Sequence, residues 1–201
     1  MPAIKKVSRE AIVDAAVEVL RDGGFSTVNA RSVAKKLGCS TQPIYLSFQS
    51  MDALKAALIE RATAIHAQRV RDFIQSHEGD DSRYTGYGMG FVNFAAQERQ
   101  LFRWLYLEDN QPGRFQDDML LSETLQTIMD EFGYDDATAR SFHRAMVYYA
   151  YGLAILANTG HLNLTETELR EAFRREFCAL TAIYGAPPKL PEFARKRGAA
   201  L

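Results

Sequence analysis

Apolar residues recur at intervals of three and four along almost the whole chain, and few folds are compatible with this spacing. Residues three and four apart lie on one face of an α-helix, so each segment can bury one side and expose the other. No segment shows sustained strand alternation between hairpin turns. The chain is therefore predicted to be all-α, and the helices expected in its second half lie near residues 84–97, 100–108, 115–132, 136–158 and 166–184.

Residues that favour helix ends predict where several helices begin and stop. Side chains that can accept from the free amides of a first turn are expected at Ser8, Asn29, Ser40 and Ser50. Gly23 and Gly24 are expected to end the first helix, and Gly38 is expected to end the second in the left-handed conformation. Thr165 and Glu168 have the spacing of a capping box before the last helix. The N-terminal region is thus predicted to form three short helices and then a longer one over residues 50–77.

Three residues near the N-terminus, Ala34, Gly38 and Ile44, have the spacing of a helix-turn-helix motif. A small residue permits close helix crossing, glycine makes the turn, and a branched aliphatic residue anchors the second helix. The N-terminal half of that second helix is the part that meets base edges in a major groove, and it presents Thr41, Gln42, Pro43, Tyr45, Leu46 and Ser47. The alternative is a helical hairpin that only packs.

The charge is distributed unevenly along the chain. The first 50 residues contain seven Lys and Arg against four Asp and Glu, and the whole chain has a net charge of −1, so the remainder carries −4. A basic head on an acidic body is typical of a chain whose head meets a polyanion. Lys5 and Lys6 form a short basic arm before the first helix. Double-stranded DNA is the expected partner of the head.

Cysteine use and apolar runs bear on the compartment. Cys39 and Cys178 lie far apart in sequence and give neither a disulfide framework nor a paired metal-ligand spacing. The longest apolar run, residues 145–157, has 13 residues, fewer than the roughly 18 that suggest a membrane span. No apolar stretch of signal-peptide type precedes the first helix. A cytoplasmic protein without a membrane partner is expected.

Several short motifs follow one another between residues 8 and 58, namely Gly24-Phe25-Ser26-Thr27, Arg31-Ser32-Val33-Ala34, Leu37-Gly38-Cys39-Ser40, Ile44-Tyr45-Leu46-Ser47-Phe48 and Asp52-Ala53-Leu54. Together they resemble the N-terminal domain of TetR-family transcriptional regulators. Further along, Tyr148-Tyr149-Ala150-Tyr151-Gly152-Leu153 followed by Thr159-Gly160 is similar to one C-terminal subgroup of that family. The resemblance implies a homodimeric, usually repressing DNA-binding protein that a small molecule releases from its operator.

The resemblance also implies which residues touch DNA, and these are Lys5, Lys6, Arg31, Ser40, Thr41, Gln42, Pro43, Tyr45 and Ser47. Ser40 and Tyr45 are expected at phosphates, whereas Thr41, Gln42 and Ser47 are expected at base edges. Gln42 suits adenine, because its amide can pair with both N6 and N7, worth roughly 1–3 kcal/mol of discrimination.

Two positions depart from the family pattern. Many members have a lysine where this chain has Thr41 and another where it has Met51, so two phosphate contacts are expected to be missing. Lys5 and Lys6 could partly compensate from outside the groove. Arg31 is expected either at a phosphate or in an intramolecular pair with a carboxylate.

Aromatic residues gather in the middle of the chain, and one helical face carries Tyr84, Tyr87, Phe91 and Phe94. Such a stripe is usually core, and the alternative is a cavity that binds a ligand. Glycines at positions 86, 88 and 90 predict a helix start that is soft, irregular or closely approached by another backbone. In the second alternative, this region is the mobile entrance of a pocket for a small apolar or aromatic effector. The walls of the pocket would include Tyr87, Phe91, Phe102, Trp104, Tyr106, Tyr148 and Tyr151.

The last two long helices are expected to pair with their copies in a second chain. Residues 145–157 are apolar around nearly the whole helical circumference and need cover on several sides. The expected four-helix interface contains Leu153, Leu156, Leu169, Phe173, Phe177 and Leu180, and the alternative is a monomer core. A dimer would place two recognition helices about one DNA turn apart, roughly 34 Å, as a palindromic site requires.

Enzyme signatures are weak in this sequence. The glycines at positions 86, 88 and 90 lack the spacing of a dinucleotide fingerprint and follow no strand. The four histidines show no metal-ligand spacing and are expected on the surface: His66, His77, His143 and His161. No catalytic residue, metal or cofactor is therefore expected, and the chain is predicted not to be an enzyme.

These patterns predict an N-terminal three-helix helix-turn-helix domain over residues 1–49, a larger helical effector-binding and dimerisation domain over 50–185, and a flexible tail over 186–201. The predicted function is that of a transcriptional regulator, a repressor that binds a palindromic operator as a homodimer and is released by a small effector. The alternative is a DNA-binding interaction protein whose body dimerises or docks a protein partner without a small molecule.

Overall fold

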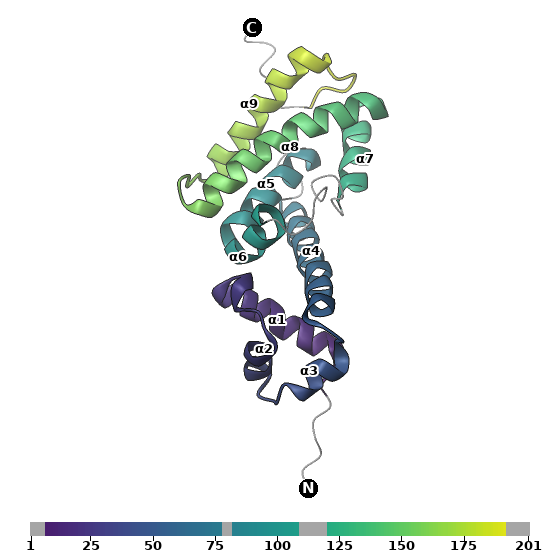
Figure 1. The fold of residues 1–201 in the computed structure, drawn as a ribbon. Helices are drawn as coiled ribbons and strands as arrows, with labels where there is room; N and C mark the ends of the chain where they lie inside the picture. Colours follow the sequence, from purple (N-terminus) through teal and green to yellow (C-terminus); the bar gives the residue numbers. More distant parts are fainter. Residues whose placement is uncertain (1–6, 78–81, 109–119, 192–201) are drawn as a thin grey trace. The chain divides into compact units, whose positions relative to one another are not determined.

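The computed structural model describes residues 7–77, 82–108 and 120–191, and its regular secondary structure in these ranges is helical throughout (Figure 1). This confirms the all-α prediction. In chain order the elements are α1 (Arg9–Gly23), a 3-10 turn η1 (Phe25–Thr27), α2 (Ala30–Leu37), α3 (Gln42–Ser47), α4 (Met51–Ser76), α5 (Arg83–Gln97), α6 (Arg99–Phe102), a π-helical segment η2 (Arg103–Leu107), α7 (Leu121–Phe132), α8 (Asp136–Thr159) and α9 (Glu166–Tyr184).

Most predicted helix ends are confirmed. Ser8 accepts from the Ala11 amide at 3.1 Å, and Gly24 follows α1 with a φ of 77°. Thr165 and Glu168 form the predicted capping box at the start of α9. The segment predicted over 115–132 is described only from residue 120 onward, where the helix begins at Leu121. Lys5, Lys6 and the end of the predicted tail, 192–201, lie outside the described residues.

The chain forms two compact units. The first contains Met1–Ile65 and Glu98–Pro112, and the second contains His66–Gln97 and Gly113–Leu201. The division falls within α4, whose residues up to Ile65 belong to the first unit and whose residues from His66 onward belong to the second. Because packing units and functional domains need not coincide, the boundaries proposed at residues 49 and 185 stay predictions.

Helix α5 is held at both ends within the second unit. At its start the Glu131 carboxylate of α7 accepts from the Ser82 hydroxyl at 2.6 Å and from the Arg83 amide at 2.9 Å. At its end the fully buried Asn158 of α8 donates to the Ala95 carbonyl at 2.8 Å. These bonds satisfy backbone groups that a helix leaves open at its termini. They fix α5 against α7 and α8.

Candidate nucleic-acid interface

The helix-turn-helix motif forms as its spacing predicts. Asn29 accepts from two amides in the first turn of α2, and the Ser32 hydroxyl accepts from the Asn29 amide in return. Gly38 follows α2 with a φ of 66°, in the left-handed region that favours glycine. Ala34 is 3% exposed and Ile44 1% exposed, so both are buried in the first unit, where α2 and α3 each pack on α1. The turn glycine has its predicted conformation, and the small residue and the anchor are both buried.

The second helix of the motif begins later than predicted. The Thr41 carbonyl accepts from the Tyr45 amide at 3.3 Å, which makes Thr41 the N-cap of α3. Ser40 lies one position too early, and the described residues supply no side-chain cap to this helix. The prediction that Ser40 caps the helix is therefore wrong. Its assignment to a phosphate stays a prediction.

Helix α3 buries one side and exposes the other. Ile44 is buried, whereas Tyr45 is 60% exposed and Leu46 79% exposed. Gln42 is also exposed, and Thr41, Pro43 and Ser47 are half-buried. Successive helical residues differ by about 100°, so Gln42 and Leu46, each two positions from Ile44, point away from the buried side. We call Gln42, Tyr45 and Leu46 the outer face of α3.

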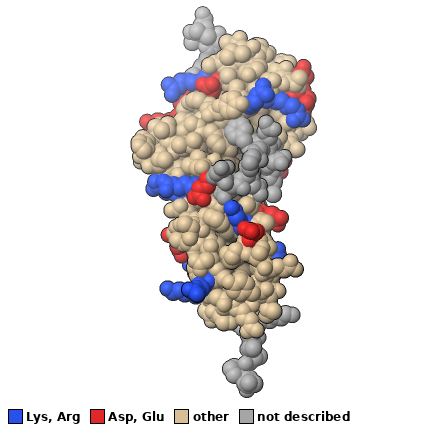
Figure 2. Space-filling view, in the orientation of Figure 1, with Lys and Arg blue, Asp and Glu red and all other residues tan. Residues whose placement is uncertain are grey.

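Cations lie beside this face rather than on it. Helix α3 itself contains no charged residue. Arg31 and Lys35 of α2 are exposed and form no ion pair with any residue that the structure describes, whereas Lys36 pairs with Asp22 at 3.0 Å. In Figure 2 blue atoms lie on the part of the surface where α2 is drawn in Figure 1, and the surface at α3 is tan in this view. An uncharged face flanked by cations suits base edges bordered by phosphates.

Arg9 is a further residue at this site that the sequence prediction omitted. Its guanidinium donates to the Ser47 carbonyl at 3.1 Å and lies 4.1 Å from the centre of the Phe48 ring. Arg9 thereby holds the end of α3 against the start of α1. A cation in the first turn of a helix opposes the helix dipole, and this unfavourable placement is the signal that could have indicated a partner.

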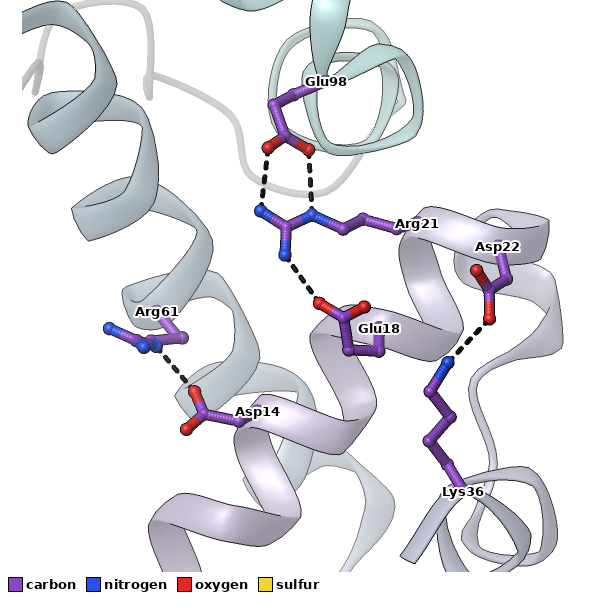
Figure 3. A network of polar contacts seen from close by, with 7 residues as sticks. All are labelled: Asp14, Glu18, Arg21, Asp22, Lys36, Arg61 and Glu98. Carbon is purple, nitrogen blue, oxygen red and sulfur yellow. Dashed lines mark hydrogen bonds and ion pairs between the residues drawn. The ribbon is translucent and has the colours of Figure 1, made fainter.

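Three carboxylates of α1, those of Asp14, Glu18 and Asp22, form ion pairs inside the first unit (Figure 3). Arg21 donates to both Glu98 oxygens, at 2.9 and 2.8 Å, and to Glu18 at 2.6 Å. The hydrogen bonds that Arg21 donates to the Glu98 carboxylate raise the pKa of Arg21, although burial opposes this. Asp14 accepts from Arg61 of α4 at 2.9 Å. These contacts connect α1 to α4 and to the start of α6, and they offset acidic charge that would otherwise repel DNA.

The aromatic residues predicted to line one pocket divide between the two units. In the second unit, Phe91 of α5 and Tyr151 of α8 have ring centres 5.0 Å apart, Tyr87 is buried, and Tyr148 is 60% exposed. In the first unit, three of these residues lie on α6 and η2, namely Phe102, Trp104 and Tyr106, and the ring centres of Phe102 and Tyr106 are 5.3 Å apart. The structure thus brings together two pairs of the predicted residues. The pocket itself stays a prediction.

The glycines of α5 lie at close contacts. A Cβ on Gly86 would lie 3.0 Å from Ile74, and one on Gly90 would lie 3.3 Å from the Cα of Val70. A Cβ on Gly88 would lie 2.6 Å from the Phe173 ring. Of the three alternatives for these glycines, close approach by a neighbour is the one observed, because α5 is a continuous helix here. Their expected role as a mobile entrance has no support in this packing.

Gly88→Ala is expected to lower the free energy of unfolding by about 1–2 kcal/mol. Overpacking costs roughly 1–3 kcal/mol, and the higher helix propensity of alanine returns up to about 1 kcal/mol. The Phe173 ring cannot simply move away, since it is 2% exposed and packs edge-on against Tyr149. Urea unfolding followed by circular dichroism measures the effect. In the double variant with Phe173→Leu the two losses should be less than additive, and full additivity would contradict the contact.

The predicted dimer residues lie mostly in the core of the single chain. Leu169, Phe173, Phe177 and Leu180 of α9 are at most 8% exposed, because this face of α9 packs on α5 and α8. Leu153 is half-buried, and only Leu156 is 43% exposed. These α9 residues offer little surface to a second chain, which favours the monomer-core alternative for them, and their assignment to the interface stays a prediction. The large apolar side chains left exposed on α8 and α9 are Tyr148, Ile155, Leu156 and Ile183.

The prediction that all four histidines lie on the surface is wrong for His66. This residue is 1% exposed, and its ring packs 4.8 Å from the Phe94 ring and 5.6 Å from the Phe91 ring. His77 is half-buried and pairs with Glu166 at 3.1 Å. Among the described residues there is no group of three His, Cys, Asp or Glu side chains that could hold a metal. None of the helices in these ranges combines the length and the hydropathy that a membrane span requires.

Comparisons with known proteins agree with this architecture. The sequence model described as "Bacterial regulatory proteins, tetR family" matches residues 12–58. A TetR-like transcriptional regulator from Rhodococcus sp. RHA1 has a TM-score of 0.58 and 20% identity, and the alignment covers 88% of this chain and 95% of that one. A TetR family transcription regulator from Marinobacter aquaeolei VT8 has a TM-score of 0.60 and 18% identity, over 85% and 94% of the two chains. At such identities the likeness shows a shared fold. No curated protein matches the sequence.

Proposed function

Because the chain belongs to the tetR family of bacterial regulatory proteins, we propose that it is a cytoplasmic repressor that binds a palindromic operator as a homodimer. A small apolar or aromatic effector releases it from the DNA. The outer face of α3 is the observation that carries the DNA-binding part of this proposal. It combines an exposed amide, an exposed phenol and an exposed aliphatic side chain on a helix that Ile44 anchors.

The phosphate and base contacts have separate residues in this proposal. Gln42 pairs with adenine, and Thr41 and Ser47 reach neighbouring base edges. Tyr45 and Ser40 donate to phosphates, and Arg31 supplies a charge beside the groove. Lys5 and Lys6 would add backbone contacts from the arm. Base contacts set the sequence preference, whereas phosphate contacts set the salt dependence.

The effector proposal rests on the partly exposed aromatic pair of Phe91 and Tyr151. These rings come from α5 and α8 and lie next to the buried His66 ring, which packs against Phe91. An apolar or aromatic ligand would bury ring surface that the free chain leaves open. A thermal-shift screen tests this, since a ligand at 100 times its Kd should add roughly 2.7 kcal/mol of stability. A stabilising compound must also lower operator affinity, and one that leaves DNA binding unchanged would contradict release.

Gln42→Ala is expected to lower affinity for the operator by about 1–3 kcal/mol without changing affinity for random duplex. Arg31→Ala should weaken binding to both duplexes and reduce the slope of log affinity against log salt by about one. Fluorescence anisotropy on the DNA that flanks the gene, with random duplex as competitor and at several salt concentrations, measures both effects.

The matched control for these variants is Arg140→Ala, which removes an exposed arginine from α8 in the second unit. It should leave the salt slope unchanged. If the wild-type chain binds a pool of random duplexes without enriching any sequence, the proposed function is overturned. A slope that falls equally for Arg31→Ala and Arg140→Ala would contradict the assignment of Arg31.

A further inference from the structure

We propose that Leu46 reads the C5 methyl group of a thymine in the major groove, an inference that rests on the DNA-binding function proposed above. Leu46 is 79% exposed, the largest exposure among the large apolar side chains that the structure describes. One exposed leucine is ordinary on a protein surface. Its neighbours and its fixed direction give this one a specific partner.

The direction of Leu46 is set by the residues that hold α3. Ile44 and Phe48 are 1% and 2% exposed, so the helix is anchored at both of these positions. Arg9 also fixes the last carbonyl of the helix, that of Ser47. Turning Leu46 inward would expose Ile44, which makes the outward direction the stable one. Leu46 therefore presents a branched aliphatic end wherever the outer face of α3 docks.

The chemistry of the groove supplies one apolar partner for that end. A·T pairs expose the adenine N7 and N6, the thymine O4 and the thymine methyl, whereas G·C pairs expose only polar groups. Because α3 has no charged residue, it cannot bind phosphate through an ion pair. Gln42 lies one turn earlier on the same side of the helix, where its amide suits adenine. An A·T-rich stretch would thus provide an adenine for Gln42 and a thymine methyl group for Leu46.

The test removes only the methyl group. The tightest duplex is selected from a random pool with the wild-type protein, and each thymine in it is replaced singly by deoxyuridine. At one thymine in each half-site, removal of the methyl group is expected to lower the affinity of the wild-type protein for the duplex roughly fourfold. This is the effect expected from burying one such group. For Leu46→Ala the same replacement should have no effect, and for Leu46→Met, which keeps an apolar end, it should still weaken binding.

Each outcome has one meaning. The methyl contact is overturned if no deoxyuridine replacement weakens DNA binding by the wild-type protein, or if a replacement weakens binding by Leu46→Ala to the same extent. The proposed function stands in either case. If the wild-type protein selects no sequence, the proposed function fails and this inference fails with it. If Leu46→Ala keeps the whole thymine pattern but changes the oligomeric state, the leucine contacts another protein chain rather than DNA. Gln42→Ala is the control variant, and it should keep the methyl sensitivity.

Discussion

Replacing Trp104 with alanine is expected to lower the free energy of unfolding by about 3–5 kcal/mol, the range for deleting a buried aromatic ring. The indole is 1% exposed and stacks on the Phe25 ring, with ring centres 4.9 Å apart and planes inclined by 13°. Both residues belong to the unit that carries α3, so the loss should also reduce DNA binding at temperatures where the variant unfolds. Urea unfolding followed by circular dichroism measures the free energy of unfolding of the wild-type chain and of Trp104→Ala.

The result distinguishes packed core from ligand pocket for this residue. Leu107→Ala is the control, because Leu107 lies on the same η2 segment but is 42% exposed, and its loss should be below about 1 kcal/mol. If Trp104 lined an open cavity, its removal would cost little more than that. A small effect for Trp104→Ala would therefore contradict core packing and favour the prediction that Trp104 lines a pocket. The wild-type chain has one tryptophan, so its emission reports on this stack alone.

The helical fold could be predicted because its signals are local. Asn29 and Gly38 act on the backbone within a few residues of themselves, and Thr165 with Glu168 does the same. Ser40 failed as a cap although it is the right residue type, since two candidate positions adjoin and the Thr41 carbonyl accepts the first helical bond. Choosing between neighbours depends on how the turn after α2 is packed. That information is tertiary.

The candidate sites show the same limit. Leu169 and Phe173 of α9 have the spacing of an interface, but the same spacing suits a core, and their burial in the protomer favours the core. Gly88 has no local reason to be glycine in a helix, and the Phe173 ring from α9 supplies one. Arg9 contacts a carbonyl 38 residues away in sequence. No local pattern contains such partners, so sequence analysis found the surface of α3 but not the contacts behind it.

Exposed residues on α8 form the proposed dimer surface, and Leu156 among them is also predicted from the sequence. Tyr148 is 60%, Leu156 43% and Ile155 37% exposed, and Gly152 between them is exposed with no atom within 4 Å of a Cβ placed there. Their spacing puts them on one face of the helix, which we call the outer stripe of α8. A glycine inside a helix costs about 1 kcal/mol, and nothing in the single chain requires it at this position. A second helix that approaches closely at this point would require a glycine there.

Leu156→Glu is expected to halve the sedimenting mass and to lower operator affinity by about 10²–10⁴-fold. A dimer would have to bury the new carboxylate without a partner, and each single chain would then bind one half-site without the gain of the second. The helical content should not change, because Leu156 is exposed in the single chain. Ser122→Glu is the control, since it adds the same charge at an exposed position in the first turn of α7. If Leu156→Glu sediments like the wild-type dimer, the copies do not pair through the outer stripe of α8. A wild-type chain that is monomeric at micromolar concentration would leave each α3 to bind its half-site alone.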